Sequence, residues 1–235
     1  MSLALLTGAT GVLGRELAKQ LARDYKLVLH YRSSEEVLSR LLQDPAVRGA
    51  VVKVVKWDFS QGRLDNFIEE VVSAGTPELV VLSASYYDDT PADKVGEELF
   101  DYLVKVNLVA PTYLALKLGT LMNGGLIVML SDMVPLLGHR AYPELRPSIP
   151  YVASRGSLHY VVEYLAKELA PKVRVVGVAV GWVDNPRASR RLREKVLRTI
   201  PTRAFVKPEE VYEVIKLAVR TPNMSGSFLV LSGGL

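Results

Sequence analysis

The sequence predicts an α/β protein built on a doubly wound, parallel sheet of about seven strands with helices on both faces. Apolar, β-rich runs alternate with segments of helical periodicity, and no repeat or linker interrupts this alternation. The strand segments are apolar throughout, which is typical of strands that helices cover on both faces. A length of 235 residues suits one domain with a sizeable core, so we expect residues 1–235 to form a single unit.

The first half of the chain supplies four predicted strands and the helices that follow them. Each strand is a short apolar run such as "LALLTG" or "AVVKVVKW", and each helix repeats apolar residues every three to four positions, as in "VLGRELAKQLARDY". The expected strands are 3–8, 26–31, 50–57 and 78–85, and the expected helices are 12–25, 34–43, 61–74 and a long one within 94–119.

The second half continues the alternation and contains two stretches that are expected to be irregular, 133–150 and 182–207. Long loops in a compact domain are usually functional. Ligands of such sheets bind at the carboxyl ends of the strands, where both stretches would emerge, and we expect 182–207 to be a substrate-binding loop. The remaining elements are strands at 124–132, 172–181 and 226–233 and helices at about 151–170 and at 208–219.

Composition excludes several classes of protein. The chain contains no cysteine, which excludes disulfides, thiolate chemistry and cysteine-based metal sites, and we expect no metal. Neither a secretory leader nor an apolar run of membrane length is recognised, so a cytoplasmic protein without membrane contact is expected. The basic pI of about 9.2 owes much to residues 187–198, which are either a solvated helix face or a basic rim around an anionic ligand. Because no aromatic residues alternate with these charges, nucleic-acid binding is not expected.

The segment "TGATGVLG" at 7–14 follows the first strand and opens the first helix, as in a Rossmann-type dinucleotide site. Gly8 permits a tight turn, Gly11 lets the backbone approach a phosphate, and Gly14 lets the helix pack on the strand. Backbone N–H groups at the start of the helix then favour an anionic pyrophosphate. The predicted contacts are made by Gly8, Thr10, Gly11, Val12, Leu13 and Gly14.

The end of the second strand, "HYRSS", predicts the cofactor preference. An acidic residue there would bind the ribose 2′-hydroxyl of NAD, but Tyr31, Arg32 and Ser33 stand in this place. A guanidinium and hydroxyls suit a 2′-phosphate, so NADP(H) is preferred over NAD(H). Asp58, after the third strand, either accepts a hydrogen bond from the adenine amine or caps the helix that follows.

These motifs, together with "SAS" at 83–85, "VNLVAP" at 106–111, "YVASR" at 151–155 and "GWV" at 181–183, resemble the short-chain dehydrogenase/reductase family over nearly the whole chain. The resemblance implies a homodimer or homotetramer. It implies cofactor contacts at Ser83, Ala84, Ser85, Gly181, Trp182 and Val183, although "SAS" departs from the family's Asn-Asn-Ala-Gly. It also implies that Asn107 holds a water in the proton path, the alternative being a residue that marks a helix kink.

The family's catalytic Ser closes the fifth strand, and here either Ser131 or Asp132 occupies its position. Alignment of "GGLIVMLSD" by its glycines and apolar run favours Asp132. An Asp at this place resembles the pteridine and dihydropterin reductases, as do "LHYRS", "SASYYDDTP" and "NLVAP". A carboxylate accepts from N–H donors or, with a raised pKa, donates a proton, which suits a nitrogen-rich ring such as a pterin. The alternative is that Asp132 caps a turn in the following loop.

Tyr151 is the candidate general acid, and Arg155 stands where the family has Lys. A phenol titrates near pH 10 and needs a nearby cation to act near neutrality. Arg155 keeps the positive charge and can reach ribose hydroxyls, but it cannot release a proton. "YPELR" at 142–146 has the same spacing, but no long apolar helix follows it, so Tyr151 is preferred.

The sequence therefore predicts an NADP(H)-dependent oxidoreductase that transfers hydride to a C=O or C=N group of a small-molecule substrate, with a pterin-like ring as one possibility. Tyr86, Asp132, Trp182 and Arg187 are the predicted substrate contacts, and Tyr87 and His139 are further aromatic candidates. Two alternatives stay open. One is a general carbonyl or 3-oxoacyl reductase of the same family, and the other is a catalytically impaired NADP(H)-binding sensor.

Overall fold

A computed structural model describes residues 1–137, 146–185 and 188–235. Seven parallel strands form one sheet in the order β3-β2-β1-β4-β5-β6-β7, which confirms the predicted fold class. The chain reverses its direction across the sheet between β1 and β4, and this switch point opens a crevice at the carboxyl ends of the strands. The strands are β1 (Leu3–Thr7), β2 (Lys26–Tyr31), β3 (Val51–Lys56), β4 (Leu79–Leu82), β5 (Gly125–Asp132), β6 (Val173–Val180) and β7 (Phe228–Leu231).

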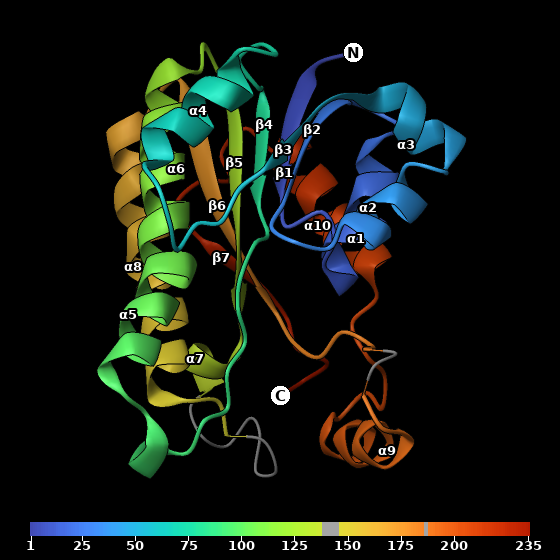
Figure 1. The fold of residues 1–235 in the computed structure, drawn as a ribbon, viewed down its shortest axis with the longest axis vertical. Coiled ribbons are helices and arrows are strands. Elements are labelled where there is room, and N and C mark those ends of the chain that lie inside the picture. The colour runs from blue at the N-terminus through green and yellow to red at the C-terminus, as the bar shows by residue number, and fades with distance from the viewer. Residues whose placement is uncertain (138–145, 186–187) are drawn as a thin grey trace.

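Helices cover both faces of this sheet (Figure 1). One face carries α1 (Val12–Leu21), α2 (Glu35–Leu41), α3 (Pro45–Ala50) and α10 (Pro208–Arg220). The other face carries α4 (Leu64–Val72), α5 (Glu97–Val104), α6 (Ala110–Leu121) and α8 (Ile149–Leu169). The helices α7 (Val134–Leu137) and α9 (Arg190–Thr199) lie near the carboxyl ends of the strands.

The core consists of two layers, one on each side of the sheet, because successive strand residues point to opposite faces. In β1, Leu6 packs into the layer under α1 and α10, while Leu5 packs into the layer under α4, α6 and α8. Phe67, Leu114 and Leu158 fill the second layer and are fully buried. The sheet is thereby held rigidly between the helices, so the loops at its carboxyl edge have a fixed base.

Three helices lie in segments that the sequence did not predict as helical. α3 begins at Pro45, and the carboxylate of Asp44 accepts from the N–H groups of Ala46 and Val47. α7 lies within 133–150, and α9 lies within 182–207. A helix near α9 was expected only as one interpretation of the basic residues 187–198, because α9 is strongly charged and its apolar residues form only a narrow stripe, ending in the buried Val196.

The predicted long helix within 94–119 is divided into four pieces. A 3₁₀ turn (η1, Ala92–Lys94) precedes α5, and a π-helical turn (η2, Lys105–Val109) joins α5 to α6. Such a π turn inserts one extra residue into the helix and is frequent at functional sites. Here it includes the buried Asn107, which makes two hydrogen bonds to the loop after β4.

The run Glu97–Leu121 has a mean hydropathy of 1.2 over its most apolar window, so by length and composition alone it satisfies the criterion for a membrane-spanning helix. No run of membrane length was expected from the sequence. In the fold the segment behaves as a core helix, because Leu114 and Leu118 are fully buried against the sheet. Packing accounts for part of its apolar composition, since Val109, Leu116 and Leu121 are exposed, and the absence of membrane contact stays a prediction.

Candidate active site

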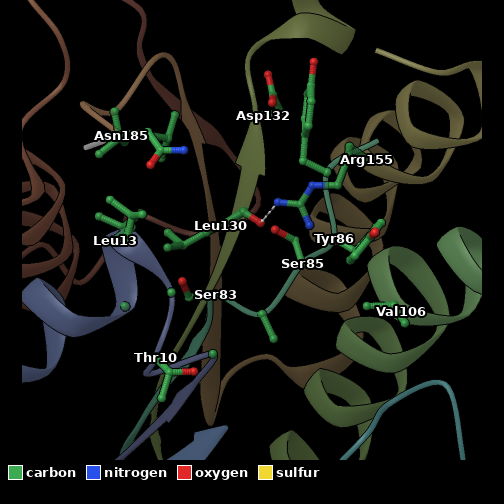
Figure 2. Close-up of a pocket in the computed structure, with 18 of the residues that line it drawn as sticks. Thr10, Leu13, Ser83, Ser85, Tyr86, Val106, Leu130, Asp132, Arg155 and Asn185 are labelled. Carbon is green, nitrogen blue, oxygen red and sulfur yellow. Dashed lines mark hydrogen bonds between the residues drawn. The ribbon is translucent and has the colours of Figure 1, made fainter. Parts of the chain in front are cut away.

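A cavity of about 770 Å³ runs along the carboxyl edge of the sheet. The carboxyl ends of six strands, β1 to β6, and the loops after them contribute to it, including the glycine-rich turn and the start of 182–207. Figure 2 shows Thr10 and Leu13 on one side, where α1 begins, and Arg155 and Asp132 on the other. Ser83 and Ser85 lie between them, which is the arrangement expected for an elongated ligand laid across the switch point.

The glycine-rich turn is fixed by contacts that only glycine permits. Gly8 has a φ of 72°, in the left-handed region, and a Cβ there would lie 2.9 Å from the Cα of Ala84. A Cβ on Gly14 would lie 2.1 Å from the carbonyl oxygen of Gly8. The N-cap residue of α1 is Gly11, which has no side chain to cap the helix. The first amides of α1 therefore receive no side-chain hydrogen bond from the N-cap position. The turn therefore fits a pyrophosphate group.

The hydroxyl of Thr7 joins the same turn to the loop after β4. Its Oγ1 accepts from the N–H groups of Ser83 at 3.0 Å and Ala84 at 3.1 Å. The "SAS" segment thus keeps a structural link to β1 although it lacks the asparagines of the family pattern. Gly181 and Val183 also line the cavity, as predicted, from the end of β6.

The adenosine end of the cavity contains Arg32, whose Nη1 donates to the hydroxyl of Tyr102 in α5. The same guanidinium lies 5.8 Å from the ring centre of Tyr86. Ser33 lines the cavity beside Arg32, whereas Tyr31 is buried in β2 and is not among the lining residues. The side chain of Tyr31 therefore does not face the cavity, where its cofactor contact was predicted.

Asp58 lines this end of the cavity and is ordered by its own loop. Its Oδ1 accepts from the backbone N–H of Ser60 at 2.8 Å and from the Ser60 hydroxyl at 2.7 Å. Partial burial raises the pKa of Asp58, but the two bonds from Ser60 and the positive charge of Arg32 hold the pKa below its ordinary value. The carboxylate is thus ionised near neutral pH. It does not cap α4, which begins after Arg63.

Asp132 and Tyr151 form a direct pair, which answers the question of Ser131 versus Asp132. The hydroxyl of Tyr151 donates to Oδ2 of Asp132 at 2.8 Å, and the N–H of Val134 donates to Oδ1 at 2.8 Å. The hydroxyl of Ser131 instead donates to the carbonyl oxygen of Arg155 at 3.1 Å. Adjacent strand residues point to opposite faces, so only one of the two can meet Tyr151. Asp132 also caps the turn after β5, which confirms the capping alternative, and its role in the reaction stays a prediction.

Arg155 is almost fully buried, and its Nη2 donates to the carbonyl oxygen of Leu130 at 2.5 Å (Figure 2). Within the described residues, no hydrogen bond joins its guanidinium to Tyr151. Burial and the neighbouring Asp132 raise the pKa of Tyr151 well above 10, and the charge of Arg155 opposes this without reversing it. The charge of Arg155 thus acts on the Tyr151 pKa in the expected direction, but burial and Asp132 outweigh it. The phenol is a protonated donor over the whole ordinary pH range.

Asn107 does not face the cavity. Its Oδ1 accepts from the N–H of Tyr86, and its Nδ2 donates to the carbonyl oxygen of Tyr86, each at 2.8 Å. Asn107 thus fixes the loop after β4 from within the π turn, in keeping with the helix-kink alternative. Its role in holding a water stays a prediction.

Aromatic side chains form the walls beside the Asp132–Tyr151 pair. The ring of Tyr87 meets that of Tyr151 edge to face, with 5.1 Å between ring centres, and Trp182 lines the cavity at the start of 182–207. Partial burial and the carboxylates of Asp89, Asp132 and Asp88 raise the pKa of Tyr87 to about 12. The predicted contact Arg187, like His139 and most of "YPELR", lies outside the described residues.

Several lining residues were not predicted as site residues: His30, Asp89, Asn185, Ala188 and Leu192. Asn185, Ala188 and Leu192 belong to 182–207, so the predicted substrate loop does reach the cavity. Position alone could have indicated His30, which immediately precedes the predicted 2′-phosphate segment. The basic residues of α9 are largely exposed, and Arg193 pairs with Asp184 at 2.5 Å, so this segment forms a solvated helix face.

Comparison with known proteins agrees with this geometry. A model of the short chain dehydrogenase family matches residues 2–196. The chain belongs to this family. Carbonyl reductase family member 4 of Xenopus tropicalis is 30% identical, with 99% of this chain and 96% of that protein covered. The 3-oxoacyl-[acyl-carrier-protein] reductase FabG of Thermotoga maritima is 27% identical, with coverage of 98% and 96%.

A solved structure with the same fold is FolM alternative dihydrofolate reductase 1 of Brucella canis, complexed with NADP. It superposes with a TM-score of 0.86 at 21% identity, covering 99% of this chain and 93% of that one. This short-chain dehydrogenase is thus an oxidoreductase of the NAD(P)-dependent kind. Its glycine turn fits the pyrophosphate of such a cofactor. Arg155, Ser85 and Leu130 would hold the nicotinamide half, because they line the cavity next to Tyr151.

Proposed function

We propose that the protein is an NADP(H)-dependent reductase of a C=O or C=N bond in a flat, nitrogen-rich ring of the pterin kind. The observation that carries this proposal is the hydrogen bond from Tyr151 to Asp132. A carboxylate at the reacting end of the cavity accepts from ring N–H and amino groups, which a plain ketone does not offer. The aromatic rings of Tyr87 and Trp182 line the same end and suit a flat ring.

The preference for NADP(H) is supported by the charge at the adenosine end. Arg32 and Ser33 line the cavity after β2, and no acidic residue follows this strand until Glu35. A guanidinium donates to phosphate oxygens through charge-assisted bonds, whereas an acidic side chain would repel them. The NADP complex of the Brucella canis protein, which has the same fold, is in keeping with this preference.

The chain's own residues provide the acid and its support. When bound, the reduced nicotinamide supplies the hydride. Burial and Asp132 raise the pKa of Tyr151, which keeps it protonated but makes it a weaker acid, so donation of its proton to the substrate heteroatom depends on the opposing charge of Arg155. Asp132 is half-buried and touches both the phenol and the cavity, so it can carry a replacement proton from solvent to Tyr151. Arg155 supplies a fixed positive charge that limits the cost of the transient phenolate.

Two other functions have observations in their favour. Full-length relatives include a carbonyl reductase and a 3-oxoacyl reductase, which favours a general reductase of acyclic carbonyls. The bond from Arg155 to Leu130, together with a Tyr151 pKa that is raised and not lowered, favours a cofactor-binding protein without turnover. These alternatives differ in substrate range and in turnover, so one assay separates them.

The test is oxidation of NADPH, followed by absorbance at 340 nm, with dihydropterins, quinones, small ketones and a 3-oxoacyl thioester. We expect turnover with a dihydropterin and a loss of at least about 100-fold in kcat in Tyr151→Phe, in line with the contribution of a general acid. The matched control is Tyr160→Phe, because Tyr160 lies on the same helix but is 73% exposed. Turnover with ketones or thioesters alone would favour the general reductase, and binding of NADPH without any turnover would favour the sensor.

A further inference from the structure

A buried histidine holds the glycine-rich turn and has no part in the proposed chemistry. His30 lies at the end of β2, is 2% exposed, and lines the cavity beside the turn. Its Nδ1 accepts from the N–H of Gly8 at 3.1 Å, and its Nε2 lies 3.0 Å from the carbonyl oxygen of Trp57. Its backbone oxygen accepts from the N–H of Ala9 at 2.8 Å. One residue thus links the ends of β1, β2 and β3.

The contacts settle which form of the imidazole is present. An N–H from Gly8 can bond to Nδ1 only if that nitrogen carries no proton, so the single proton of the neutral ring lies on Nε2 and is donated to Trp57. The ring stacks on Phe59 with 4.3 Å between centres and meets Phe67 edge to face. Burial among apolar rings and the N–H donated by Gly8 to Nδ1 therefore keep His30 neutral, against the opposite effect of the Trp57 carbonyl.

We propose that His30 is a positioning residue that pre-forms the pyrophosphate-binding turn by taking up the N–H of Gly8. Gly8 sits in a left-handed conformation, and its N–H points away from the cavity toward β2. With this amide bonded and Thr7 anchored to the loop after β4, the turn is held at both flanks before any ligand arrives. The amides at the start of α1 then remain directed at the cavity. A site that is ordered in advance loses less free energy when it binds its ligand.

This inference rests on the proposed binding of NADP(H), and two substitutions separate it from a general packing role. In His30→Asn, Oδ1 takes the place of Nδ1 and can accept from Gly8, but the side chain is too short to reach Trp57. In His30→Gln, the terminal amide takes the place of Nε2 and can donate to Trp57, but the acceptor for Gly8 is lost. Both variants lose the same ring contacts with Phe59, and each keeps one of the two hydrogen bonds, so their difference weighs the bond to Gly8 against the bond to Trp57.

The experiment measures the dissociation constants of NADP⁺ and 2′-AMP for the wild type and both variants, because 2′-AMP carries no pyrophosphate. We expect NADP⁺ to bind about tenfold more weakly to His30→Gln and within about threefold of the wild type to His30→Asn. The affinity for 2′-AMP should stay unchanged in both. Hydrogen exchange of the free protein should show faster exchange in residues 5–14 in His30→Gln only.

Equal affinities of the two variants for NADP⁺ would overturn the positioning role. So would a parallel loss for NADP⁺ and 2′-AMP, because that would indicate a general disturbance of the adenosine end. If the wild type binds neither NADP⁺ nor NAD⁺, the proposed function fails, and this result is distinct because it appears before any substitution is made.

Discussion

Gly14 lies so close to Gly8 that adding a single methyl group, in Gly14→Ala, is expected to disturb the glycine-rich turn. In Gly14→Ala, the new Cβ would lie 2.1 Å from the carbonyl oxygen of Gly8 and 2.9 Å from its carbonyl carbon. Both are backbone atoms, so no side-chain rotation relieves the contact. An ordinary contact needs 3.4 Å or more, so turn and helix must separate by about 1 Å. Leu17 and Leu21 anchor α1 in the core, where both are fully buried, so the turn is expected to move and not the helix.

The magnitude follows from this displacement. Overpacking of this kind costs about 1–3 kcal/mol of unfolding free energy. A shift of about 1 Å in groups that orient a ligand can cost about 100-fold in function. We therefore expect Gly14→Ala to bind NADPH about 100-fold more weakly, measured by titration of NADPH fluorescence, and to unfold at lower urea concentration.

Gly49→Ala is the matched control, because Gly49 also lies in a helix but nothing lies within 4 Å of its Cβ position. Replacement of an unstrained helical glycine should stabilise the fold by about 0.5–1 kcal/mol and leave the affinity for NADPH unchanged. If Gly14→Ala keeps the affinity and stability of the wild type, the assignment of this turn as the pyrophosphate site is refuted.

Two further predictions concern the adenosine end of the cavity. Arg32→Gln should weaken NADPH binding about 10- to 100-fold and leave NADH binding unchanged. Arg40→Gln serves as the control. An equal loss of affinity for both cofactors would contradict the role of Arg32 in binding the 2′-phosphate. Burial lowers the pKa of His30 from 6.5 to about 4, so the unfolded chain binds more protons between these values. The resulting stability is complete above pH 6.5 and falls by at most about 3 kcal/mol as the pH drops to about 4. Urea unfolding against pH should therefore show a flatter profile for His30→Asn, and identical profiles would refute the buried neutral state.

Much of the fold follows from the sequence because strand and helix periodicities are strong here. The strands are predicted to within a few residues, and β2 is predicted without error as 26–31. The helix α3 was missed because it is short, and α9 was only one of two alternatives because it is mostly charged, so neither has a broad apolar face.

The sequence predicts many of the residues that line the site, but it predicts few of the hydrogen bonds between them. The sequence narrows the catalytic position to Ser131 or Asp132, and only the pleat of β5 against α8 determines which one meets Tyr151. Arg155 donates to a backbone carbonyl oxygen, and because every residue has one, the sequence does not show which residue accepts this bond. The same holds for Asn107 and for His30, which bind backbone groups of Tyr86 and Gly8.

The most direct test of the central claim is the substrate preference of Asp132→Ser, which restores the residue usual in the family. Asp132 is claimed to recognise nitrogen-bearing rings and to supply protons to Tyr151. The measurement is kcat/KM with NADPH for a dihydropterin and for a plain ketone. We predict a loss of about 100-fold for the dihydropterin, with activity on the ketone retained or raised. An unchanged ratio between the two substrates would contradict the claim.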